Sequence, residues 1–241
     1  MIISHHFKFI FIKTNKTAGT SIEWALSKLL RKGDMLTTII EEEERQKQIN
    51  TKGLIYLNKE LSPRMRKKFK PHSPLSAAHK AFPETKDYFS FGILRNPFKR
   101  YISGFRYHKS QAIKRAINET ATPDLEATLQ HQFYQYIISD KGLGLMHKGR
   151  DLFNYCDTEG NHISINRILR LEDIEKTIES CLSPLGLNIN PKDIPHLKSQ
   201  FIKIPNTINL WSHENTKTIT DRHAWEFKHL YDQRIRAIKD N

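Results

Sequence analysis

The sequence has few cysteines and no long apolar run, and these two shortages exclude several classes of protein. Only two of the 241 residues are cysteine, Cys156 and Cys181, which is too few for a disulfide scaffold and typical of a reducing compartment. No run of about 18 apolar residues occurs, so we expect no transmembrane helix. The first twelve residues lack the basic region and cleavage site of a secretory signal. We therefore predict a cytoplasmic protein that begins with a strand.

Metal-binding and nucleic-acid-binding motifs are also missing. The twelve histidines are scattered and form neither Cys/His clusters nor a His-Glu-x-x-His spacing, so no metal is expected. The 39 basic and 26 acidic residues give a net charge of +13, which predicts an anionic partner. The basic residues are dispersed, and no zinc-finger, RNA-binding or basic-zipper signature appears. Nucleic acid is therefore not the expected partner, whereas peripheral contact with an anionic surface stays open.

The sequence does contain a strand, a loop of small residues and a helix near its N-terminus. The apolar run Phe7–Ile12 predicts a buried strand. Apolar residues recur at helical spacing from Ile22 onward, and Thr20 with Glu23 is a candidate capping box. Backbone N–H groups and the positive end of a helix dipole meet at such a junction, which favours a phosphate. The loop reads Lys13-Thr14-Asn15-Lys16-Thr17-Ala18-Gly19-Thr20-Ser21.

A second strand–turn–helix segment is predicted further along the chain. Tyr88–Leu94 is a buried apolar run, and Pro97 suits the first turn of a helix because its missing N–H is no loss there. Arg95 then follows the strand, while Ser103 lies about two turns inside the helix. A guanidinium and a hydroxyl at these positions suit the binding of one phosphate.

The remaining sequence predicts helices, a hairpin and one long solvated excursion in a single domain, residues 1–241. The excursion is Met35–Lys70, whose basic block before His72 is a weak candidate for the entrance of an acidic acceptor. Apolar periodicity and turn residues predict the other elements: a helix at Asp124–Ile138, a hairpin of Leu152–Cys156 with Ile163–Leu169, a helix through Ile178, Cys181 and Leu182, a polar loop at Pro205–Thr218, and a last helix at Thr220–Ile238 with Trp225 inward.

The two phosphate segments resemble those of the sulfotransferases that use 3′-phosphoadenosine 5′-phosphosulfate (PAPS). The loop around Lys16 looks like their 5′-phosphosulfate loop, and the segment from Arg95 to Ser103 looks like their 3′-phosphate segment. Asn15 departs from the family, in which many members have proline. The resemblance is to members that modify carbohydrates such as heparan sulfate. It implies an α/β, three-layer, P-loop-like fold with a central, mainly parallel sheet flanked by helices.

The resemblance also implies roles for individual residues. Lys16 is expected to stabilise charge as adenosine 3′,5′-bisphosphate leaves, and Arg95 and Ser103 are expected to hold the 3′-phosphate. A histidine base is expected before the second strand, and His72 is preferred to His79, with a Glu or Asp base left open. The acceptor is expected to be a hydroxyl on a carbohydrate or glycolipid. The residues expected around the 5′-phosphate are Lys13, Lys16, Thr17, Ala18, Gly19, Thr20 and Ser21.

Two other functions stay open from the sequence alone. A small-molecule kinase also binds phosphates, but the loop G-x-x-x-x-G-K-[ST] is absent because Lys16 precedes Gly19. A non-catalytic basic module for nucleic acid or anionic glycans would account for the net charge without any chemistry. The sequence does not indicate an oligomeric state.

Overall fold

The structure, a computed structural model, divides into two compact units that are described separately. Unit 1 comprises Met1–Leu94 and Arg150–Leu197, and unit 2 comprises Arg95–Gly149 and Lys198–Asn241. The residues described are 1–37, 54–56, 69, 72–120, 122–139, 155, 164–195 and 202–231. Most of the excursion at Met35–Lys70 and the first arm of the expected hairpin, apart from Tyr155, lie outside them.

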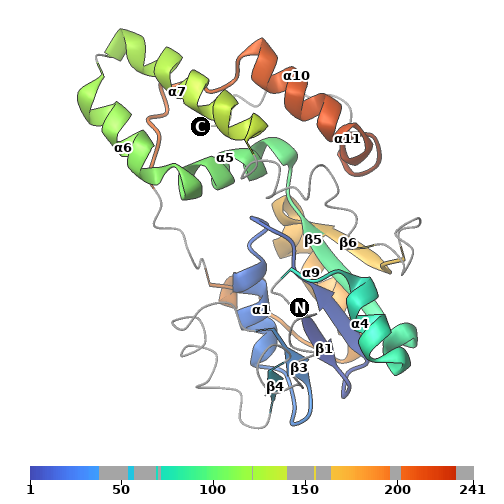
Figure 1. Ribbon diagram of the computed structural model, residues 1–241. Coiled ribbons are helices and arrows are strands. Elements are labelled where there is room, and N and C mark those ends of the chain that lie inside the picture. Colours follow the sequence, from blue (N-terminus) through green and yellow to red (C-terminus); the bar gives the residue numbers. More distant parts are fainter. Residues whose placement is uncertain are drawn as a thin grey trace. The chain divides into compact units, whose positions relative to one another are not determined.

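Unit 1 is built on a six-stranded, mainly parallel sheet in the order β4-β3-β1-β2-β5-β6 (Figure 1). β2 pairs in parallel with β5, β5 with β6 and β3 with β4, while β1 runs antiparallel to β2 and β3. The expected mainly parallel sheet flanked by helices is therefore present. The strands are β1 (Ile2–Ser4), β2 (Phe9–Ile12), β3 (Met35–Leu36), β4 (Ile55–Tyr56), β5 (Phe89–Leu94) and β6 (Arg167–Arg170).

The first expected strand needed correction. The segment before Ile12 forms two antiparallel strands, β1 and β2, because the chain turns at residues 5–8, where Lys8 adopts a left-handed conformation (φ 54°). Phe7 accordingly lies in this turn instead of in the strand.

The expected hairpin of Leu152–Cys156 with Ile163–Leu169 lies largely outside the described residues. Within them, the backbone N–H groups of Ser164 and Ile165 donate to the carbonyl oxygen of Tyr155 at 2.9 and 3.2 Å. The residues that follow form β6, which pairs in parallel with β5, a distant segment that local turn signals do not reveal.

Helices cover both faces of this sheet. One face buries Phe9, Phe11 and Phe91 against α1 (Gly19–Ser27) and α9 (Ile174–Leu182). Phe11 and Phe91 are also cross-strand partners, with ring centroids 5.2 Å apart, and such pairs stabilise adjacent strands. On the other side of the sheet lies α4 (Leu75–Ala81), followed by the 3₁₀ turn η1 (Pro83–Asp87). The face covered by α1 and α9 makes the apolar core of unit 1.

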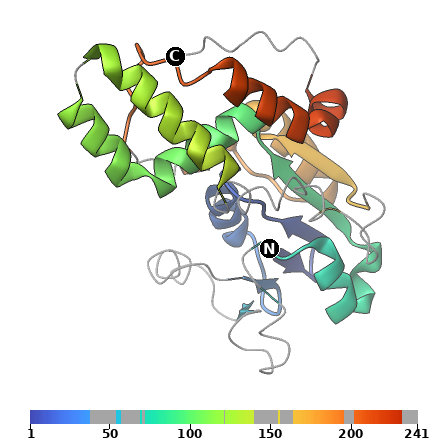
Figure 2. The same ribbon diagram turned by 45° about the horizontal axis from the view of Figure 1, so that its top comes forward.

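Unit 2 is helical in its described residues (Figure 2). Its core contains Phe105, Leu129, Phe133 and Ile219, all fully buried. The expected helix at Asp124–Ile138 is confirmed as part of α7. The helices are α5 (Pro97–His108), α6 (Ser110–Glu119), α7 (Thr122–Ile138), α10 (His213–Arg222) and α11 (Ala224–Leu230).

The C-terminal part of unit 2 differs from the expected polar loop followed by one helix. α10 already begins at His213, because the Ser212 side chain accepts a hydrogen bond from the backbone N–H of Asn215 and caps the helix. The chain then breaks at His223 before α11 begins. Trp225, expected to point inward, is 41% exposed. Residues beyond Tyr231 lie outside the described part.

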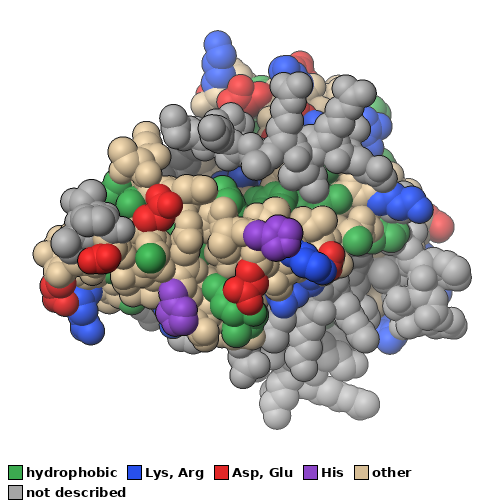
Figure 3. All heavy atoms as spheres, turned by 90° about the horizontal axis from the view of Figure 1, so that it is seen from above, with side chains coloured by type: hydrophobic (Ala, Val, Ile, Leu, Met, Phe, Trp, Pro, Cys, Tyr) green, Lys and Arg blue, Asp and Glu red, His purple; other side chains and the backbone are tan. Residues whose placement is uncertain are grey.

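No helix among the described residues is long and apolar enough to cross a membrane. On the face shown in Figure 3, the cationic and anionic side chains of the described residues are interspersed. A single continuous basic surface, as expected for a nucleic-acid-binding module, is not visible among the described residues of that face.

Candidate active site

The loop after β2 has a backbone shape suited to binding an anion. Lys16 and Ala18 both have left-handed conformations, with φ of 59° and 55°, and the intervening Thr17 has an ordinary negative φ. Conformations of alternating hand turn successive N–H groups towards one point and form an anion-binding concavity. α1 begins immediately afterwards at Gly19, and the N–H groups of its first turn have no acceptor within the helix. The loop therefore combines two features typical of anion sites at the position where a phosphate was expected.

Two threonines hold this loop in place, and one of them attaches it to the neighbouring strand β5. The Thr14 hydroxyl donates to the carbonyl oxygen of Ile93 at 2.8 Å, and the Thr17 hydroxyl donates to the carbonyl oxygen of Thr14 at 3.1 Å. Both side chains are almost completely buried. The Thr17 hydroxyl is thus used to close the loop, and its backbone is what remains for an anion.

Tyr155 also holds the end of β5, although the sequence did not single it out. Its hydroxyl donates to Ile93 O at 3.1 Å, and its ring lies against Gly92. A Cβ at Gly92 would lie 2.3 Å from the ring carbon Cε1, so only glycine fits here. A glycine inside a predicted strand often marks such a close approach, and this was the one signal for Tyr155 in the sequence.

The expected capping box at the start of α1 is absent. The N-cap residue is Ala18, which makes no side-chain capping bond. The Thr20 hydroxyl and the Glu23 carboxylate instead accept hydrogen bonds from Lys13 Nζ, at 2.8 and 3.1 Å. Glu23 is fully buried, and a buried carboxylate is stabilised more by a full positive charge than by a backbone N–H.

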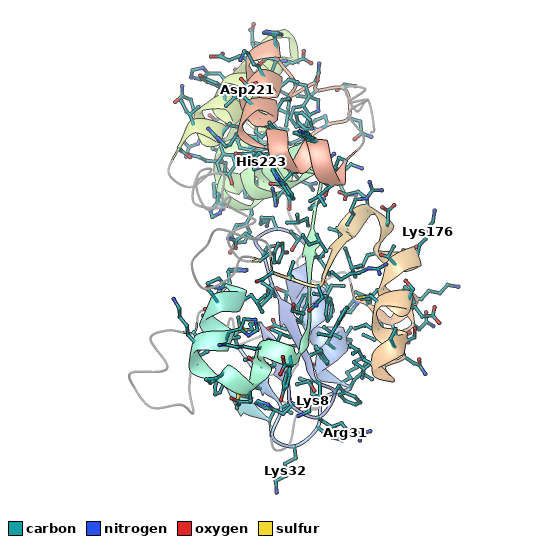
Figure 4. All side chains as sticks on the ribbon, turned by 90° about the vertical axis from the view of Figure 1, so that its right-hand side faces the viewer. Lys8, Arg31, Lys32, Lys176, Asp221 and His223 are labelled. Atoms are coloured by element: carbon teal, nitrogen blue, oxygen red, sulfur yellow. The ribbon has the colours of Figure 1, made fainter. Side chains whose placement is uncertain are left out.

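The other residues expected around the phosphates are found at several degrees of exposure. Ala18 is exposed, Lys16 and Thr20 are partly buried, and Lys13, Gly19 and Ser21 are buried. The labelled cations Lys8, Arg31 and Lys32 lie at the end of the sheet where β2 begins, opposite the loop (Figure 4). They are therefore remote from this loop.

Arg95 and Ser103 belong to unit 2 and are placed as the sequence predicted. Arg95 directly follows β5, and Ser103 lies on α5 about two turns after Pro97. Pro97 occupies the first helical position, and the Asn96 side chain caps the helix by accepting from the N–H groups of Phe98 and Lys99. Both Arg95 and Ser103 are partly buried.

The structure distinguishes the two candidate bases. His72 Nδ1 lies 3.1 Å from the carbonyl oxygen of Lys13. A carbonyl only accepts, so Nδ1 carries the proton, and Nε2 of the neutral imidazole is left able to accept one. His79 lies on α4 and bonds to the Thr85 hydroxyl at 3.2 Å. Of the two, His72 is the histidine that bonds to the loop after β2, at Lys13.

The surroundings of both histidines favour the neutral form. Burial, followed by the positive charge of Lys13, lowers the pKa of His72 to about 4. Burial, followed by the charge of Lys86, also lowers the pKa of His79. A neutral imidazole at physiological pH is the state that a general base requires.

The shift at His72 predicts how stability depends on pH. Between about pH 4 and 6.5 the unfolded chain binds a proton at His72 that the folded chain does not, so stability rises with pH across this window. We expect His72→Gln to remove this slope. Between about pH 7 and pH 5, the free energy of unfolding should therefore fall by about 2 kcal/mol less in the variant than in wild type. Urea unfolding at both pH values measures the difference. His131→Gln, at an exposed histidine of α7, should behave as wild type, and an unchanged slope in His72→Gln would contradict the prediction.

Comparison with known proteins identifies the family of the chain. No curated protein and no solved structure gave a match. A family model described as "Sulfotransferase family" matches residues 1–237, a span that includes the loop after β2, His72, Arg95 and Ser103. Since the match covers nearly the whole chain, the protein belongs to the sulfotransferase family.

Proposed function

We propose that this protein transfers a sulfuryl group from PAPS to an acceptor hydroxyl on a carbohydrate or glycolipid. The observation that carries the proposal is the loop of unit 1, where left-handed Lys16 and Ala18 lie directly before the start of α1, a geometry that suits an anion. Family membership supplies the reaction class. The donor, the acceptor and a three-layer, P-loop-like arrangement in one domain are part of the proposal.

The donor set of the loop suits a phosphosulfate group. Backbone N–H groups and a lysine are the groups that bind phosphate oxygens in other proteins. In the proposed reaction PAPS supplies the sulfuryl group and leaves as adenosine 3′,5′-bisphosphate. The loop backbone from Thr17 to Ser21 binds the 5′-phosphate, and Lys16 stabilises the negative charge that develops on the leaving oxygen. Arg95 and Ser103 bind the 3′-phosphate.

His72 is proposed to take the proton of the acceptor hydroxyl at Nε2. The bond from Nδ1 to Lys13 O keeps the ring oriented and fixes its tautomer. With a pKa of about 4 in the free protein, the imidazole is a weak base. A bound anion raises that pKa by favouring the protonated form, so the base becomes stronger when the donor is present.

Isothermal titration with adenosine 3′,5′-bisphosphate in EDTA tests the donor assignment. We expect wild type to bind it without a metal, to bind AMP more weakly, and to lose about ten-fold or more in affinity on Arg95→Ala, because a hydrogen bond to a charged group is removed. Arg115→Ala, at an exposed arginine of α6, is the matched control and should leave affinity unchanged. Equal binding of both nucleotides, or none, would overturn the proposal and favour the basic module.

A further inference from the structure

Lys13 is a lysine buried beneath the first turn of α1. Its side chain is 3% exposed, and Nζ donates to Thr20 Oγ1 at 2.8 Å and to Glu23 Oε2 at 3.1 Å. The aliphatic part of the side chain passes close to Gly19, where a Cβ would lie 2.5 Å from Lys13 Cγ. The side chain therefore runs directly under the helix start that faces the proposed anion.

The hydrogen bond between Lys13 and Thr20 has only one direction. An ammonium group donates and has no lone pair, so Thr20 Oγ1 accepts. The hydroxyl proton of Thr20 must then point to some other acceptor. A hydroxyl that accepts from a cation is polarised and becomes a stronger donor. Thr20 is partly exposed in the first turn of α1, which is where an anion at the loop would need such a donor.

Glu23 pairs with Lys13 through one carboxylate oxygen. The carboxylate is fully buried, and its other oxygen accepts from the N-terminal ammonium of Met1 at 3.2 Å. A buried ammonium is stable only when it is paired and hydrogen-bonded, and Glu23 provides that pairing. Because the Lys13 ammonium is engaged by Glu23 and Thr20 and its side chain is almost inaccessible, Lys13 is poorly placed to bind an anion directly.

We propose that Lys13, held by Glu23, is a positioning residue that orients the Thr20 hydroxyl towards the 5′-phosphate of the donor. This replaces the direct contact that the sequence suggested for Lys13 with an indirect role through Thr20. The inference rests on the proposed function, since the anion is the donor's 5′-phosphate.

A double-mutant cycle in ligand affinity tests this role. Isothermal titration with adenosine 3′,5′-bisphosphate compares wild type, Thr20→Val, Lys13→Met and the combination of both. In Lys13→Met the buried carboxylate of Glu23 keeps the Met1 ammonium as its partner, so no buried charge is left alone. We expect Thr20→Val to lower affinity about ten-fold. Lys13→Met should lower affinity about three- to ten-fold when Thr20 is present and should cause no further loss when Thr20 is already valine.

The outcomes separate the inference from the proposed function. If wild type does not bind the bisphosphate, both are overturned. If wild type binds but Lys13→Met lowers affinity by the same factor with and without Thr20, only the positioning role is overturned, because Lys13 then acts without Thr20. Adenosine 3′-monophosphate, which lacks the 5′-phosphate, should bind all variants equally, and unequal binding would overturn the positioning role as well. Should Lys13→Met fail to fold, Lys13→Gln gives the same comparison.

Discussion

Replacing Lys16 with methionine is expected to lower the rate of sulfuryl transfer by about a hundred- to a thousand-fold, the usual effect of removing one donor to a developing negative charge. Affinity for adenosine 3′,5′-bisphosphate should fall much less, because the backbone N–H groups of the loop remain. The expected loss is therefore mainly in kcat. Release of the bisphosphate from PAPS, in the presence of a polysaccharide that serves wild type as acceptor, measures the rate.

The exposed Lys28, at the other end of α1, provides a matched control. Its ammonium lies 3.5 Å from the centre of the Trp24 ring, so Lys28→Met removes an equal charge away from the loop and should leave the rate unchanged. If Lys16→Met kept more than about a tenth of the wild-type rate, the lysine would not be stabilising the transition state to the extent proposed.

The second large effect is expected on stability, at a buried ion pair in unit 2. Arg100 is fully buried on α5, and its Nη2 donates to both carboxylate oxygens of Glu226 at 3.1 Å. His223 Nδ1 lies 2.7 Å from Glu226 Oε1 and joins the same group. Removing one partner of a buried pair leaves a charge without compensation. We therefore expect Glu226→Gln to lower the free energy of unfolding by about 3 to 5 kcal/mol.

Urea unfolding of wild type, Glu226→Gln and Asp221→Asn measures this difference. Asp221 pairs with Lys217 on α10, but both side chains are more than half exposed, and surface pairs of this kind contribute little. Asp221→Asn should accordingly unfold almost as wild type does. If both variants lost the same free energy of unfolding, burial of the Arg100–Glu226 pair would not be the cause of its contribution to stability.

The same pair predicts that the folded state loses stability in acid. Burial raises the pKa of Glu226, but the charge of Arg100 and the hydrogen bond from His223 outweigh it, so the pKa lies below its ordinary value of 4.5. The folded state then holds this proton less strongly than the unfolded chain. The stabilisation is complete above about pH 4.5 and is lost as the pH falls through the lower pKa of the folded state. Glu226→Gln should lack this part of the acid transition.

The two strand–turn–helix segments were predictable because their information is local. Pro97 acts within the first turn of α5, and a strand followed by small residues and a helix is visible in the sequence alone. The mainly parallel sheet was implied by the resemblance to the sulfotransferases. Some local signals were missed: the turn at residues 5–8 and the Ser212 cap of α10.

Other interactions that were missed join residues far apart in the chain. Arg100 and Glu226 are 126 positions apart, and Tyr155 reaches Ile93 across 62. The capping box failed for a related reason: Thr20 and Glu23 have the right spacing, but the buried ammonium of Lys13 offers a stronger partner than the backbone. Sequence patterns describe local preferences, and tertiary contacts with a full charge override them.

The left-handed conformation of Lys16 carries a consequence for the evolution of this loop. A side chain with a Cβ in that conformation costs about 1 to 2 kcal/mol relative to a right-handed one, and glycine would largely avoid the cost. Folding alone would therefore favour glycine at position 16, whereas the proposed chemistry favours lysine. The two demands conflict at one residue, so the loop trades stability for activity. Selection for thermal stability alone would replace Lys16 with glycine and reduce the activity.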